Sequence, residues 1–87
     1  MNHRHRKILH ALFDHPVSAN IDIKDVETML REFGAEVAVR GGDRIAVSLN
    51  GHTAAFPRTR HSISKDEVVR LRHFLTMCGI DPAAYSA

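Results

Sequence analysis

The polar loop near position 60 combines one histidine with two arginines. His61 stands one residue after Arg60 and three residues after Arg58. An imidazole can remove the proton from an RNA 2′-hydroxyl, and guanidinium groups can stabilise the charged phosphorane that forms when this hydroxyl attacks the phosphate. Because neighbouring arginines favour a neutral histidine, they would keep His61 available as a base. The alternative is that His61 is a solvated loop residue with no catalytic role.

Two further arginines, Arg40 and Arg44, flank the turn sequence Gly41-Gly42-Asp43. If this turn has three residues, Arg40 lies directly opposite Arg44 across two antiparallel strands, where like charges destabilise the pair. A phosphate would relieve this repulsion, since a guanidinium group binds phosphate through two parallel hydrogen bonds. The alternative is that the two long side chains point apart into water. The residues considered for RNA binding are Arg40, Arg44, Arg58, Arg60 and Lys65.

The seven histidines and the single cysteine do not form a recognisable metal motif. The chain lacks Cys-x-x-Cys and His-Glu-x-x-His, and His3 and His5 supply only two ligands. His52, beside a hairpin turn, is a second candidate for a catalytic base. Cys78 continues the apolar stripe of the last helix, so we interpret it as a core residue and not as a nucleophile. The sequence therefore predicts no metal and no other cofactor.

These side chains must be positioned by helices and strands, and the spacing of apolar residues predicts three helices. The first covers about 4–13. The second covers about 22–34, with Asp22 as its N-cap and a glycine at its end. The third covers about 64–79, where Ser64 opens a capping box.

Between the second and third helices, apolar residues recur at every second position, which is typical of strands. The predicted strands cover 36–40, 44–49 and 52–56. Asn50-Gly51 predicts a two-residue type I′ hairpin turn. This turn predicts the pairs Leu49–His52, Val47–Ala54 and Ile45–Phe56 on a buried face, and Ser48–Thr53, Ala46–Ala55 and Arg44–Pro57 on a solvent face.

Length and composition indicate one α+β domain, a three-stranded antiparallel meander packed on helices in the order α-α-β-β-β-α. The domain covers 1–87, with an extra leading helix over 1–15 and a loose tail over 81–87. A single cysteine forms no internal disulfide, the basic N-terminus lacks the apolar stretch of a signal peptide, and no segment is long enough to span a membrane. We therefore expect a cytoplasmic protein. The net charge is +2, and bases dominate over 35–61, which suits either a polyanionic partner or an ordinary mixed surface.

In element order and in several segments the chain resembles the HicA family, the toxins of bacterial type II toxin–antitoxin systems. The matching segments are the helix over 20–34, the strand–turn–strand through Gly42-Asp43-Arg44-Ile45, the short third strand, and 64–80. The resemblance implies a fold like that of the double-stranded-RNA-binding domain and metal-independent cleavage of mRNA. It also implies a HicB-like antitoxin that binds the toxin directly. The opening segment resembles a divergent subgroup with an extra leading helix.

One position departs from the family pattern. The family's catalytic histidine lies in a Gly-Ser/Thr-His step at the start of the second strand, where this chain has Gly42-Asp43-Arg44. Arginine stays protonated near neutral pH, so it cannot act as a general base, although it can hold a phosphate. RNA binding therefore carries over better than cleavage. A catalytic site would combine Arg44 with a substitute base, either His61 or His52.

We consider three functions on this basis. The first is a HicA-like toxin that binds mRNA and cleaves it as a metal-independent ribonuclease, an mRNA interferase. The second is a catalytically inactive HicA-like module that binds RNA or its antitoxin. The third is a protein-binding domain unrelated to nucleic acid, which predicts that Arg40, Arg44, Arg58 and Arg60 do not cluster.

Overall fold

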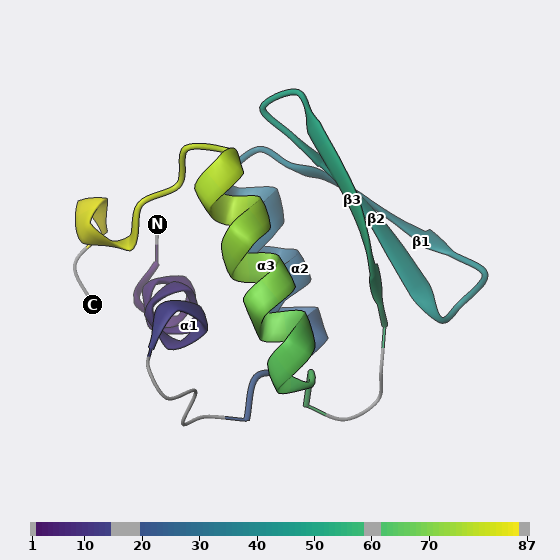
Figure 1. Ribbon diagram of the computed structural model, residues 1–87, viewed down its shortest axis with the longest axis horizontal. Coiled ribbons are helices and arrows are strands. Elements are labelled where there is room, and N and C mark those ends of the chain that lie inside the picture. Colours follow the sequence, from purple (N-terminus) through teal and green to yellow (C-terminus); the bar gives the residue numbers. More distant parts are fainter. Residues whose placement is uncertain (1, 15–19, 59–61, 86–87) are drawn as a thin grey trace.

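The computed structural model describes residues 2–14, 20–58 and 62–85. These form three layers: one helix, then a pair of helices, then a sheet (Figure 1). The α+β class and the order α-α-β-β-β-α are as predicted. In chain order the elements are α1 (His3–Phe13), α2 (Ile23–Glu32), β1 (Glu36–Arg40), β2 (Arg44–Leu49), β3 (His52–Pro57), α3 (Lys65–Met77) and a short 3-10 turn, η1 (Pro82–Ala84).

Each helix begins at a residue whose side-chain oxygen accepts a backbone N–H from the first turn. Asp22 accepts from Lys24 at 2.9 Å, and Ser64 accepts from Glu67 at 3.2 Å. Asn2 does the same for α1, accepting from the N–H of His5. These bonds satisfy N–H groups that have no partner inside a helix. The predicted caps Asp22 and Ser64 are therefore confirmed.

The sheet is an antiparallel meander in the order β1-β2-β3. Leu49 pairs with His52 and Ile45 with Phe56, as the two-residue turn predicts. Asn50 has φ 51° and Gly51 has φ 82°, the left-handed conformations of a type I′ turn. Arg40 pairs with Arg44, so the first hairpin loop has the three residues that the sequence analysis required.

The core lies between the layers, and α1 is part of it. Leu9 and Leu12 are completely buried and belong to the same cluster as Leu30, Ile45 and Leu71 from the other layers. The leading helix is thus a full layer of the fold, because it covers the side of α2 and α3 that faces away from the sheet (Figure 1).

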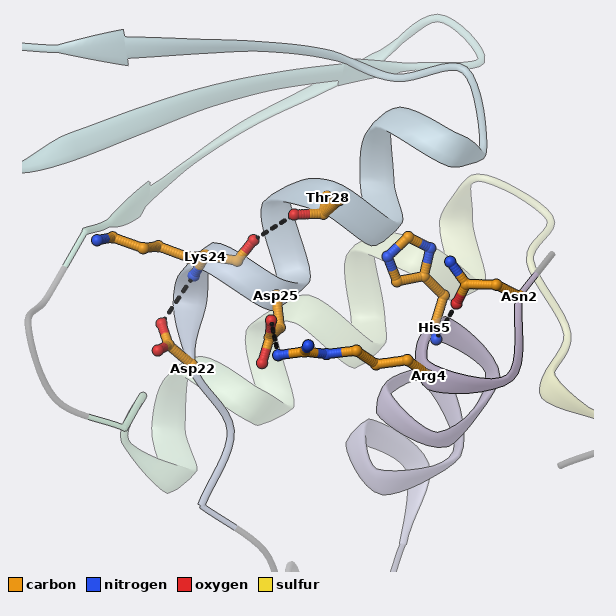
Figure 2. A network of polar contacts seen from close by, with 7 residues as sticks. All are labelled: Asn2, Arg4, His5, Asp22, Lys24, Asp25 and Thr28. Atoms are coloured by element: carbon orange, nitrogen blue, oxygen red, sulfur yellow. Dashed lines mark hydrogen bonds and ion pairs between the residues drawn. The ribbon is translucent and has the colours of Figure 1, made fainter.

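Polar contacts hold α1 against α2 as well (Figure 2). Arg4 forms an ion pair with Asp25 at 2.8 Å. The Nδ1–H of His5 donates to a carboxylate oxygen of Glu32, also at 2.8 Å, and His5 is only 8% exposed. His5 is therefore held between two helices near the start of α1.

The described part of the C-terminal segment, residues 81–85, packs against the helical side of the molecule. The ring of Tyr85 meets that of Phe33 edge to face, with centroids 5.4 Å apart. The backbone carbonyl of Tyr85 accepts a hydrogen bond from the Nε2–H of His10. The loose tail that we expected over 81–87 is therefore incorrect for its first five residues.

Candidate nucleic-acid interface

The outer face of the sheet is open, with small side chains at its centre and the charged residues Glu36 and Arg40 also lining it. All the helices lie on its other side (Figure 1). Ala38, Ala46 and Ala55 are neighbours across the three strands, and Ser48 pairs with Thr53 beside them. The face is hollowed, with a volume of about 700 Å³ above these residues. Backbone and hydroxyl groups are therefore close to any molecule that rests on this face.

Arg40 and Arg44 form a cationic rim at one end of the open face. They are paired across β1 and β2, and both are exposed. Since successive residues of a strand point to opposite faces, both side chains share a face with Ala38 and Ala46. Among the described residues, no carboxylate lies within ion-pair distance of either arginine. Two exposed arginines thus occupy paired positions on one face, with no ion-paired acid among the described residues.

Arg58 does not join this rim. Two residues beyond Phe56, it points to the helix side of the sheet, where its Nε donates to Glu27 at 3.0 Å. Glu27 is only 3% exposed, and a buried carboxylate is stable only when it is paired. Arg58 therefore satisfies an acid of α2, and its inclusion among the RNA-binding residues is not supported by its position.

Of the remaining predicted RNA-binding residues, only Lys65 is described, and it is not on the open face. Lys65 is exposed on the first residue of α3, outside the sheet. Arg60 and His61 lie outside the described residues. Among the described residues that were predicted to bind RNA, only Arg40 and Arg44 therefore lie on the open face.

His52 is not near Arg44. His52 pairs with Leu49 at one end of the β2–β3 ladder, and Arg44 pairs with Pro57 at the other. Five residues of strand separate the two positions, about 16 Å along the sheet. The two side chains also point to opposite faces, since His52 shares the inner face with Phe56. A catalytic centre that combines Arg44 with His52 is therefore not assembled.

His52 instead lines a groove between β3 and α3 together with His73. The groove has a volume of about 280 Å³, and Arg70, Phe74 and Met77 also line it. Arg70 donates to both carboxylate oxygens of Glu67, at 3.0 and 2.8 Å, and to the carbonyl of Ala55 at 2.9 Å. No local pattern in the sequence singles out His73. Only the packing of α3 beside β3 places the two histidines in one groove.

Neither metal chemistry nor thiol chemistry is indicated in the described part of the chain. No group of three or more His, Cys, Asp or Glu side chains there could hold a metal ion. Burial raises the pKa of the Cys78 thiol, and its S–H donates to the carbonyl of Leu49 at 3.4 Å. Cys78 is therefore a core residue, as predicted.

Comparison with known proteins identifies no family for this chain. No protein-family model, curated protein or solved structure matches it. None of the described helices has the length and apolar character needed to cross a bilayer.

Proposed function

We propose that the protein is a HicA-like toxin that binds RNA through the open face of its sheet. The observation that supports this proposal is the pair Arg40 and Arg44, exposed at paired strand positions on one face, with no ion-paired acid among the described residues. A phosphate that bridged the two guanidinium groups would remove their repulsion and form charge-assisted hydrogen bonds with both. The proposed partners are mRNA and a HicB-like antitoxin, and the proposed location is the cytoplasm.

The open face suits the backbone of RNA better than its bases. Its central residues are alanines, with the hydroxyl groups of Ser48 and Thr53 beside them, and no aromatic ring lines the hollow. Base stacking on proteins uses aromatic side chains, whereas ribose and phosphate are recognised by hydroxyl, backbone and cationic groups. We therefore expect weak sequence preference and strong dependence on salt.

The test is a titration of single-stranded RNA at several salt concentrations with wild type and Arg44→Ala. Binding weakens as salt rises, so the slope of log K against log salt is negative. Loss of one phosphate contact should make this slope shallower by about 0.7 to 0.9. The matched control is Lys7→Ala, which removes one exposed cation from α1, on the far side of α2 and α3 from the sheet. Equal losses in the two variants, or no binding by wild type at low salt, would contradict the proposal.

The β3–α3 groove supports a second function, metal-independent cleavage of RNA. His52 and His73 line one groove, and histidine is the side chain best suited to exchange protons near neutral pH. One imidazole would take the 2′-hydroxyl proton while the other gives a proton to the leaving 5′-oxygen. The products would be a 2′,3′-cyclic phosphate and a 5′-hydroxyl, so the step needs neither water nor metal.

An RNA cleavage assay with a chelator present separates this function from an inactive binding module. If the groove is catalytic, His52→Ala and His73→Ala should each lower the rate about 100-fold, the lower part of the range for general acid–base catalysis. If His61 is the base, as the sequence analysis suggested, His61→Ala should do so alone. Absence of cleavage by wild type, with RNA binding retained, would support the inactive HicA-like module.

A further inference from the structure

The outer edge of β1 is unpaired, although β1 lies at the margin of a regular sheet. Within the described residues, β1 pairs only with β2. Val39 on this strand is 46% exposed, one of three large apolar side chains exposed in the described chain. An open edge with an exposed apolar residue is a template for pairing with another strand.

The register determines which backbone groups of β1 face outward. The N–H of Arg58 donates to the carbonyl of Asp43 at 2.8 Å, so the backbone groups of Asp43 face β3. Because these directions alternate along an antiparallel strand, those of Ala46 face β1, and the groups of its partner Ala38 face back toward β2. The groups that point to the free edge therefore belong to Val37 and Val39.

The sequence of β1, Glu-Val-Ala-Val-Arg, is complementary in charge to its own reverse. When two copies pair antiparallel with Ala38 opposite Ala38, each Glu36 faces Arg40 of the other copy. In the same register Val37 faces Val39, which are the residues whose backbone groups point outward. Backbone pairing, apolar contact and charge pairing are thus all satisfied at one alignment.

We propose that two copies of this chain associate through their β1 edges to form a continuous six-stranded sheet. The symmetry is a two-fold axis through Ala38, so the same surface serves on both subunits. Glu36 of one copy lies opposite Arg40 of the other. This pair has no backbone hydrogen bonds between the strands, and opposite side chains are closest at such pairs. On the inner face, Val37 of one copy packs against Val39 of the other. The open faces of the two sheets become one surface.

Charge reversal provides the test, read as molar mass by light scattering or sedimentation over a concentration series. Wild type should approach twice the mass of one chain. Glu36→Arg and Arg40→Glu should each weaken self-association about tenfold or more, because both ion pairs become repulsive contacts. An equimolar mixture of the two variants should recover association, since each then meets its opposite charge. The doubly exchanged chain, Glu36→Arg with Arg40→Glu, should also associate with itself.

Val39→Pro tests the backbone contribution independently. Proline at an edge position removes an N–H that points to solvent and leaves the β1–β2 ladder intact. This variant should keep the circular dichroism of the wild type and remain a single chain. A wild type that stays at the mass of one chain up to millimolar concentration would overturn the proposal, as would a mixture of the reversed variants that fails to associate. Because Arg40 would face Glu36 of the other copy in the dimer, RNA binding is tested at Arg44 on β2, and neither result affects that measurement.

Discussion

The side chain of Arg58 is held by Glu27, a buried acid of α2. Arg58 directly follows β3, and its side chain points to the same, helix-covered side of the sheet as that of Phe56. Glu27 of α2 lies on that side. Glu27 also has Arg31 at 4.0 Å one helical turn away, but only Arg58 is within hydrogen-bond distance. The guanidinium of Arg58 therefore contributes to stability and is withdrawn from any ligand on the open face.

Substitution of Arg58 should reveal this structural role. We expect Arg58→Ala to lower the free energy of unfolding by about 2 kcal/mol, between the values for exposed and buried pairs, because the side chain of Arg58 is 31% exposed and that of Glu27 only 4%. Arg44→Ala, which breaks no such pair, should change it by less than about 0.5 kcal/mol. Urea denaturation measures both. Equal effects of the two substitutions would contradict this assignment.

Glu32 should make stability depend on acidic pH. The hydrogen bond from His5, together with the backbone N–H of Asn2, holds the pKa of Glu32 below its ordinary value of 4.5, against the effect of partial burial. The unfolded chain therefore binds more protons than the folded one below this value. The contribution of Glu32 is complete above about pH 5 and is lost as the pH falls through the folded pKa.

The measurement is urea denaturation at a series of pH values from about 6 to about 3. The free energy of unfolding should fall more steeply with acid in the wild type than in Glu32→Gln, whose side chain does not titrate. Parallel curves for the two proteins would show that the contact between His5 and Glu32 does not stabilise the fold.

Among the elements, α1 differs most from what a leading helix suggests. Its residues Leu9 and Leu12 have no exposed surface, so their removal leaves cavities inside the core. We expect Leu9→Ala to cost about 3 kcal/mol of unfolding free energy. His3→Ala, at an exposed position of the same helix, should cost less than about 0.5 kcal/mol. Similar small losses in both variants would mean that α1 is an appendage.

The β2–β3 turn also holds the end of α3. The side-chain amide of Asn50 donates to the carbonyl of Cys78 at 2.7 Å, while its backbone has φ 51°. Asn50→Gly keeps this backbone and should lose about 1 kcal/mol for the hydrogen bond. Asn50→Ala should lose about 1 kcal/mol more, because alanine is strained in the left-handed conformation. Equal stabilities for the two variants, measured by urea denaturation, would contradict this separation.

At the scale of the whole molecule, local patterns predicted the elements and their pairing, but not the contacts between layers. The Asn50-Gly51 turn was enough to predict the pairs from Leu49–His52 to Arg44–Pro57, because a two-residue loop admits one register. Of the candidate site, only the pairing of Arg40 with Arg44 could be predicted, because one short loop joins these two residues. Contacts such as Glu27–Arg58 and His5–Glu32 join residues about thirty positions apart, and no local period encodes them.

The single continuous core predicts cooperative unfolding of all three layers. Tyr85 is the sole tyrosine, the chain has no tryptophan, and its ring packs on Phe33 at the helical side. Tyrosine fluorescence therefore reports on that side, and far-UV circular dichroism reports on the whole chain. Their urea transitions should coincide, as in a two-state domain. Two separate midpoints would show that the helical side unfolds independently of the sheet.

The helix α1 and the short turn η1 lie next to each other on the side of the molecule away from the sheet (Figure 1). The segment that contains η1 contacts α1, so Asn2 and Tyr85 belong to the same region of the surface. A fluorophore or an immobilising group attached at Asn2 or Tyr85 would therefore lie away from the strands. Immobilised in this way, the molecule presents its sheet to solution, and binding can be measured without obstruction by the attachment.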